Sequence, residues 1–136
     1  MKSDRKTYVA LSAVILCVLV ATQAVFASNF SVKEYNEFHA VLHPLEHEAL
    51  PAKDFQRIRA NAGEFVKRGT ALIKVGVPKG AAAANVEEFR RELKKFKSAL
   101  DAFKKDARAG TDAQLENSFS AVHDSFEMLV GMLPRK

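Results

Sequence analysis

Three of the four histidines in the chain, His39, His43 and His47, lie four residues apart, and the fourth, His123, follows much later. A neutral imidazole nitrogen is a good ligand for zinc, copper or nickel, and side chains four residues apart lie on neighbouring turns of one helix. The spacing therefore indicates a row of nitrogen donors on one helix, with a further donor on another element.

The register of two predicted helices brings these histidines together. At roughly 100° per residue, His39 lies about 80° to one side of the apolar stripe of the first helix, and His43 and His47 lie progressively further round. On the last helix, His123 lies about 80° from the stripe in the same rotational sense, with Glu127 one turn on. If the two helices are antiparallel neighbours, His39 lies near Phe126 and His43 near His123, and these flanks meet within about one turn, ~5 Å, of the same level. The sequence thus predicts a metal site of His39, His43, His123 and Glu127, with His47 as a spare ligand.

Other arrangements remain open. The flank of the first helix that carries the histidines could instead face the second and third helices, depending on the hand of the bundle. Pro44 lacks an amide hydrogen and crowds the carbonyl of Ala40, so a kink at this position would move His43. A single histidine on a helix flank is usually a partly exposed polar residue, and for His123 alone that interpretation is favoured.

Apolar residues at intervals of three and four predict helices over about 32–50, 54–74, 85–109 and 112–133. We expect Ser31, Asp54 and Asn85 to cap the first three, and Thr111 with Gln114 to form a capping box for the fourth. Amphipathic helices joined by mostly short connections predict an all-α, up-down-up-down antiparallel four-helix bundle. The ten phenylalanines make its core aromatic.

The first 27 residues have the pattern of an export signal. Lys2, Arg5 and Lys6 precede an apolar run that ends in small residues, which predicts cleavage after Ala27. An uncleaved amino-terminal anchor is the alternative. We therefore expect residues 28–136 to form one domain in the periplasm or outside the cell.

The predicted mature chain has no cysteine, because Cys17 lies in the signal. It therefore contains no disulfide and no thiolate ligand. Removing the three basic residues of the signal and Asp4 from the 21 basic and 16 acidic residues leaves 18 against 15, a net charge of +3. This charge is too mild to indicate a nucleic-acid partner, and after cleavage we expect no membrane partner. The exposed histidines leave a homodimer open.

An exported, aromatic-cored four-helix bundle with a histidine on its last helix resembles the periplasmic b-type and c-prime cytochromes. The resemblance is one of pattern, since the Cys-x-x-Cys-His motif of the c-prime group is absent and the predicted first helix lacks the methionine of the b-type group. It implies that haem, if bound, would use His39 or His43 together with His123. The chain also resembles small periplasmic bundle proteins with a histidine-rich first helix, for which no activity is established.

The sequence predicts a non-enzymatic metal-binding protein for copper, zinc or nickel, with a b-type haem protein and a structural or interaction module without ligand as alternatives. An enzyme is not expected. Ferritin-like di-iron bundles need Glu-x-x-His pairs, and none of the residues three before the histidines is a glutamate. Phosphate loops, nucleophile elbows and Cys-x-x-Cys pairs are absent from the sequence as well.

Overall fold

The structure is a computed structural model that describes residues 29–136, and within them the chain is a bundle of four helices with no strand. The predicted signal peptide, 1–27, and its cleavage position lie outside the described residues. Of the described helices, none is both long and apolar enough to cross a membrane. The elements are α1 (Lys33–Pro44), a π-helical segment η1 (Leu45–Ala49), α2 (Phe55–Val75), a 3-10 turn η2 (Ala83–Asn85), α3 (Val86–Ala109) and α4 (Asp112–Gly131).

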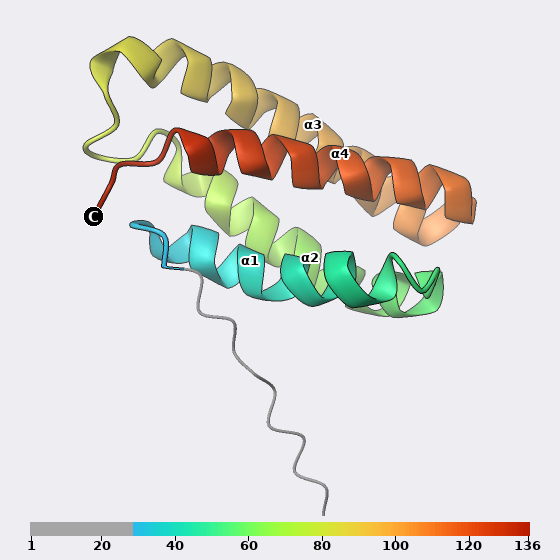
Figure 1. The fold of residues 1–136 in the computed structure, drawn as a ribbon. Coiled ribbons are helices and arrows are strands. Elements are labelled where there is room, and N and C mark those ends of the chain that lie inside the picture. The colour runs from blue at the N-terminus through green and yellow to red at the C-terminus, as the bar shows by residue number, and fades with distance from the viewer. Residues whose placement is uncertain (1–28) are drawn as a thin grey trace, which may run out of the picture.

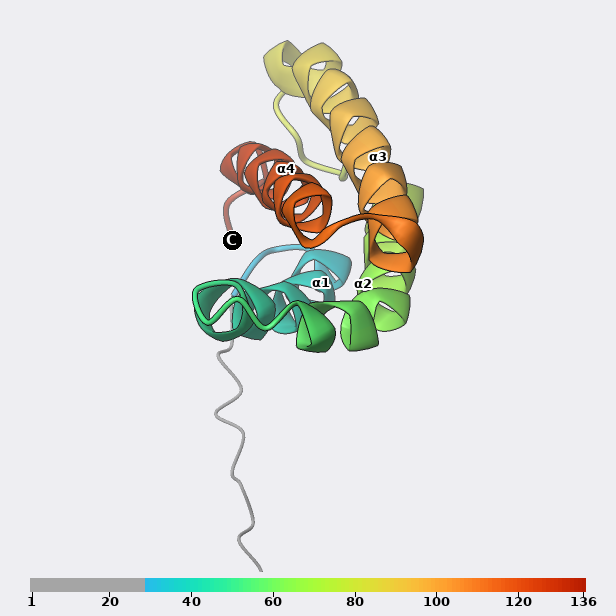
Figure 2. The same ribbon diagram turned by 90° about the vertical axis from the view of Figure 1, so that its right-hand side faces the viewer.

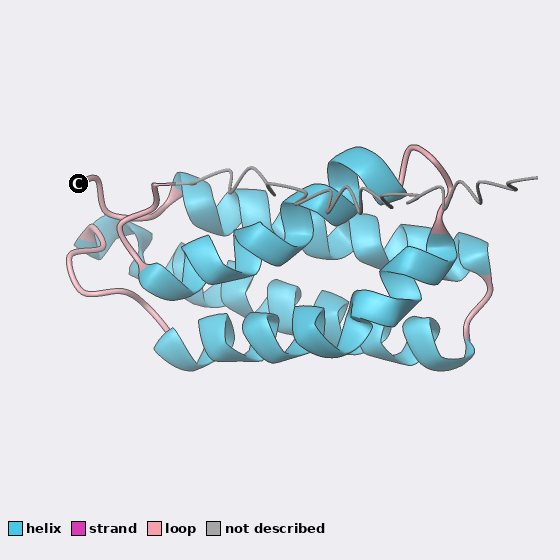
Figure 3. Ribbon diagram, turned by 90° about the horizontal axis from the view of Figure 1, so that it is seen from below, coloured by secondary structure: helices cyan, strands magenta, loops and turns pink. Residues whose placement is uncertain are grey.

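The helices lie lengthwise against one another. The connections from η1 to α2 and from α3 to α4 lie at one end of the bundle, and the connection from α2 to α3 lies at the other end with the C-terminus (Figure 1). Seen from one end, α1 and α2 form one pair, and α3 and α4 lie over it (Figure 2). Loops are confined to the connections and the two ends of the described chain (Figure 3).

Two of the predicted helix caps are confirmed. The carboxylate of Asp54 accepts a hydrogen bond from the amide of Arg57 at 3.0 Å, which satisfies a free donor of the first turn of α2. Thr111 and Gln114 form the reciprocal capping box of α4, each side chain accepting from the other residue's amide. The first residues of α2 and α4 are therefore determined by the local sequence.

Asn85 occupies the predicted N-cap position of α3, but its side chain makes no capping hydrogen bond. The cap expected at Ser31 is wrong, because the residue before α1 is Val32. Instead, the Asn36 amide reaches back from inside α1. Its oxygen accepts from the amide of Phe30 at 2.8 Å, and its nitrogen donates to the Phe30 carbonyl at 3.1 Å. These bonds fix the backbone of Phe30, whose ring packs against His39 and Phe126.

Pro44 changes the type of helix. The sequence predicts one kinked helix over 32–50, and the structure has an α-helix that ends at Pro44 and continues as the π-helical η1. In η1 the amide of Leu50 donates to the carbonyl of Leu45, five residues back, at 2.8 Å. Pro44 has no amide hydrogen to donate, and its ring crowds the carbonyl of Ala40. The wider π-helical turn that follows accommodates this interruption of the hydrogen-bond pattern. Leu45 and Ala49 stay buried in the core.

Aromatic rings fill the space between the helices. Phe38 of α1 lies 4.9 Å from Phe65 of α2 and 5.1 Å from Phe126 of α4, measured between ring centroids. Gly69 lets α2 and α3 approach closely, because a β-carbon there would lie 2.7 Å from Leu100 Cδ2. The remaining helix ends match the predicted ranges within two residues.

Arg59 ties α2 to the turn between α3 and α4. Its guanidinium donates to the carbonyls of Asp106 at 2.8 Å, Ala107 at 3.1 Å and Gly110 at 2.9 Å. A fourth contact, at 3.0 Å, reaches the carboxylate of Asp112. A cation at a helix C-terminus satisfies carbonyls that have no partner within the helix. Arg59 thus helps to hold the end of the bundle nearest η1.

Candidate functional site

The centre of the site is an ion pair between η1 and α4. Nε2 of His123 lies 2.9 Å from Oε1 of Glu46, and both side chains are partly buried, 26% and 23% exposed. On the same helix as His123, Glu127 Oε1 lies 3.9 Å from Nε2, and Asp124 Oδ1 lies 3.5 Å from Nδ1. The imidazole of His123 therefore has a carboxylate beside each of its nitrogens.

Glu46 also reaches His47. Its second oxygen, Oε2, lies 3.6 Å from Nε2 of His47, whose side chain is 59% exposed. The two oxygens of Glu46 are thus divided between an imidazole of its own segment and one from α4. The π-helical turn favours this arrangement, since successive residues advance by roughly 80° rather than 100° and so lie closer together around the axis. We refer to Glu46, His47, His123 and Glu127 as the Glu46 cluster.

The three early histidines form a row along α1 and η1. The ring centroids of His39 and His43 are 5.2 Å apart, and those of His43 and His47 are 4.3 Å apart. His39 lies against Phe126, as the predicted register requires, with centroids 6.1 Å apart and the rings stacked. The edge of Phe30 covers His39 at 5.6 Å. The inner end of the row is therefore enclosed by aromatic rings, and the outer end is open to solvent.

His39 carries a buried nitrogen without a hydrogen bond. Among the described residues, its Nδ1 and the hydroxyl of Tyr35, one turn earlier, are the buried side-chain atoms that have no partner. Burial is the main cause that lowers the pKa of His39, and the neighbouring His43 lowers it further. Glu127 and Glu46 act in the opposite direction through their charges. The His39 ring is thus held in its neutral form.

We expect His39→Leu to raise the free energy of unfolding by about 1 kcal/mol near pH 7.5, because it removes a buried polar atom that has no partner. The gain should grow on acidification. The unfolded chain takes up a proton below about pH 6.5, whereas the folded state, whose His39 pKa is lower, does not. Wild-type stability therefore falls with pH from about 6.5 down to the folded pKa, and the variant lacks this part of the slope. Urea denaturation at several pH values measures both effects.

The matched control is His47→Gln, on the exposed end of the same row. We expect it to change the free energy of unfolding at pH 7.5 by less than about 0.5 kcal/mol. A lower free energy of unfolding in His39→Leu than in the wild type, at any of the pH values measured, would contradict the buried and unpartnered state of the ring.

The structure separates the sequence-predicted ligands into two groups. His123, Glu127 and His47 gather around Glu46, whereas the ring contacts of His39 are with Phe30, Phe126 and His43. Within residues 29–136, no three His, Cys, Asp or Glu side chains stand arranged to hold a metal ion.

The residue that sequence reasoning left out of the site is Glu46. The helical register places Glu46 on the same flank as His39, and this position was the one indication that it belongs there. Its partnership with His123 depends on the geometry of η1.

Comparisons with protein-family models, curated proteins and solved structures find no match to this chain. An inference about its function therefore depends on the geometry of the chain itself.

Proposed function

We propose that this protein binds one divalent transition-metal ion, zinc, copper or nickel, at the Glu46 cluster, without catalysing a reaction. The observation that carries the proposal is the 2.9 Å contact between Glu46 and His123, with donor atoms of His47 and Glu127 3.6 Å and 3.9 Å from members of that pair. Two imidazoles and two carboxylates are a donor set that suits these metals.

The spacing of the donor atoms supports the proposal. In a tetrahedral zinc site with bonds of about 2.0–2.2 Å, neighbouring ligand atoms lie roughly 3.3–3.6 Å apart. The contacts of the Glu46 cluster, 2.9, 3.6 and 3.9 Å, lie on both sides of that value. Side-chain rotations that open the Glu46–His123 contact would make room for an ion. Asp124 would then hold the other nitrogen of His123, as the partners of metal-bound histidines commonly do.

The proposal includes the cellular setting and the topology that the sequence predicts. We take the chain to be exported, with its signal removed after Ala27, and the bundle to be an up-down-up-down antiparallel one. In that topology α1 and α4 are neighbours, and their facing flanks can share an ion. A role in the homeostasis of copper, zinc or nickel outside the cytoplasm is consistent with a donor set that has no thiolate.

The direct test is calorimetric titration of metal-free protein with zinc(II), copper(II) and nickel(II), accompanied by thermal unfolding. We expect one saturable site and a stabilisation of about 2.7 kcal/mol when free metal reaches 100 times Kd. Absence of saturable binding by all three metals would refute the proposal.

A second candidate, a structural or interaction module, is supported by the lack of a ready-made three-ligand site among the described residues. In that case the Glu46–His123 pair would only join η1 to α4. The same experiment separates the two candidates, because a module shows neither metal binding nor a metal-dependent change in Tm. A sample that takes up haemin and develops a haem absorption band would support the cytochrome-like alternative instead.

A further inference from the structure

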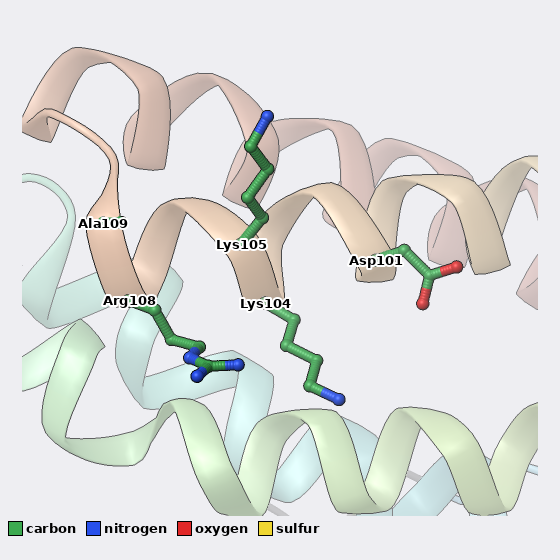
Figure 4. Close-up of a pocket in the computed structure, with 5 residues that line it drawn as sticks. All are labelled: Asp101, Lys104, Lys105, Arg108 and Ala109. Carbon is green, nitrogen blue, oxygen red and sulfur yellow. The ribbon is translucent and has the colours of Figure 1, made fainter.

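A second charged feature lies away from the Glu46 cluster, on the last turns of α3. Lys104, Lys105 and Arg108, with Asp101 and Ala109, line an open hollow of about 360 Å³ (Figure 4). Ligand pockets for small molecules have volumes of about 300–1,000 Å³, so the hollow is at the lower end of that range. Its lining is dominated by positive charge.

Most of the other cations on α3 have a carboxylate partner, whereas these three have none among the described residues. Upstream on the helix, Lys95 pairs with Glu92 at 2.7 Å and Lys97 pairs with Asp101 at 2.6 Å. Within the described chain, no ion pair joins Lys104, Lys105 or Arg108 to an acidic side chain. The single carboxylate of the hollow, Asp101, is thus already neutralised by Lys97, and three positive charges remain unbalanced.

Lys104 and Arg108 extend from the same side of α3, and Lys105 extends from the opposite side (Figure 4). Like charges four residues apart on a helix repel each other, so this pair opposes helix formation slightly. The helix dipole favours a positive charge in the last turn of α3, where Arg108 lies. Lys104 lies a full turn further inside the helix and gains less from this effect. An anion between the two groups would replace repulsion with attraction on both sides.

We propose that Lys104 and Arg108 bind a phosphate group carried by a small molecule or by a lipid headgroup. The planar guanidinium of Arg108 matches two phosphate oxygens with parallel N–H donors, and the ammonium of Lys104 adds a point charge. The stems of these two side chains provide apolar walls for the remainder of such a ligand. This site is separate from the Glu46 cluster and does not depend on metal binding.

The test is an NMR titration of the full mature chain with inorganic phosphate and with glycerol phosphate, in low-salt chloride buffer with a chelator present. We expect saturable shifts confined to the end of α3. Lys104→Gln and Arg108→Gln should each weaken binding by about five- to tenfold, since each removes one charge-assisted contact. Binding should weaken as salt is added, because the groups are exposed.

Two matched controls accompany the titration. Lys94→Gln makes the same charge change at an exposed, unpaired lysine of α3 outside the hollow, and we expect it to bind as wild type. His123→Ala, in the Glu46 cluster, should also bind phosphate as wild type. Equal weakening in Lys94→Gln, or no saturable binding in any arm, would overturn the proposal.

Vesicles identify the source of the phosphate group. Sedimentation with phosphatidylglycerol vesicles that is lost in Arg108→Gln, and absent with phosphatidylcholine vesicles, would assign the site to lipid headgroups. Saturable binding of the soluble phosphates without vesicle sedimentation would assign it to small phosphorylated molecules.

Discussion

Phe126→Ala is expected to lower the free energy of unfolding by about 3–5 kcal/mol, the usual cost of truncating a fully buried phenylalanine. The ring is completely buried and joins α4 to the first part of the chain. It stacks on Tyr35 at 5.9 Å, packs on Phe38 at 5.1 Å and meets the edge of Phe30 at 6.0 Å. The free energy of unfolding of a whole domain is about 5–15 kcal/mol, so one ring accounts for a large part of the stability of this domain.

Urea denaturation followed by circular dichroism measures the loss, and Met128→Ala provides the control. Met128 is on the same helix but is 52% exposed, so its truncation should change stability by less than about 0.5 kcal/mol. A loss below about 1.5 kcal/mol for Phe126→Ala would show that the ring does not occupy a tightly packed position between α1 and α4.

The four helices were predictable because their apolar residues repeat at the helical period. On α3, the stripe Phe89, Phe96, Leu100 and Phe103 is buried in the structure as the spacing predicts. The start of α1 was not predictable in the same way. Its conformation depends on Phe30 packing against His39 and Phe126, a tertiary contact that outweighs the capping preference of Ser31.

The change at Pro44 was predictable only in part. The sequence shows that an amide hydrogen is missing, and this predicts an irregular helix at that position. It does not show which irregularity compensates for the loss. The choice of a π-helical turn is coupled to the burial of Leu45 and Ala49 against the rest of the bundle, and such packing is a property of the whole fold.

The site illustrates the same limit. Reasoning from helical angles placed His39 and His123 on facing flanks, and it correctly placed His39 against Phe126. It assumed a regular helix beyond Pro44, however, and η1 does not follow that geometry. Glu46, which the register places on the flank of His39 but which was not predicted as a ligand, therefore lies 2.9 Å from His123. Small local changes in helix type thus decide which side chains of neighbouring helices come into contact.

His123→Ala is expected to weaken zinc binding by about 100-fold or more, whereas His39→Leu should change it by less than about threefold. Loss of a group that merely orients a metal ligand already costs about 10- to 100-fold, and His123 is proposed as a ligand itself. His123 and Glu127 are the members of the Glu46 cluster that come from α4, which is remote in sequence from η1. His39 lies behind aromatic rings, with one nitrogen buried.

Calorimetric titration of these two variants and of Glu46→Gln distinguishes the Glu46 cluster from the ligand set that the sequence predicts. If His39→Leu abolishes binding while Glu46→Gln does not, the ion is held by His39, His43 and His123, and the Glu46–His123 contact is only structural. The comparison is valid because both variants should remain folded. Breaking a partly exposed pair such as Glu46–His123 costs about 1 kcal/mol or less, so a 100-fold loss of affinity in His123→Ala would reflect the missing ligand and not unfolding.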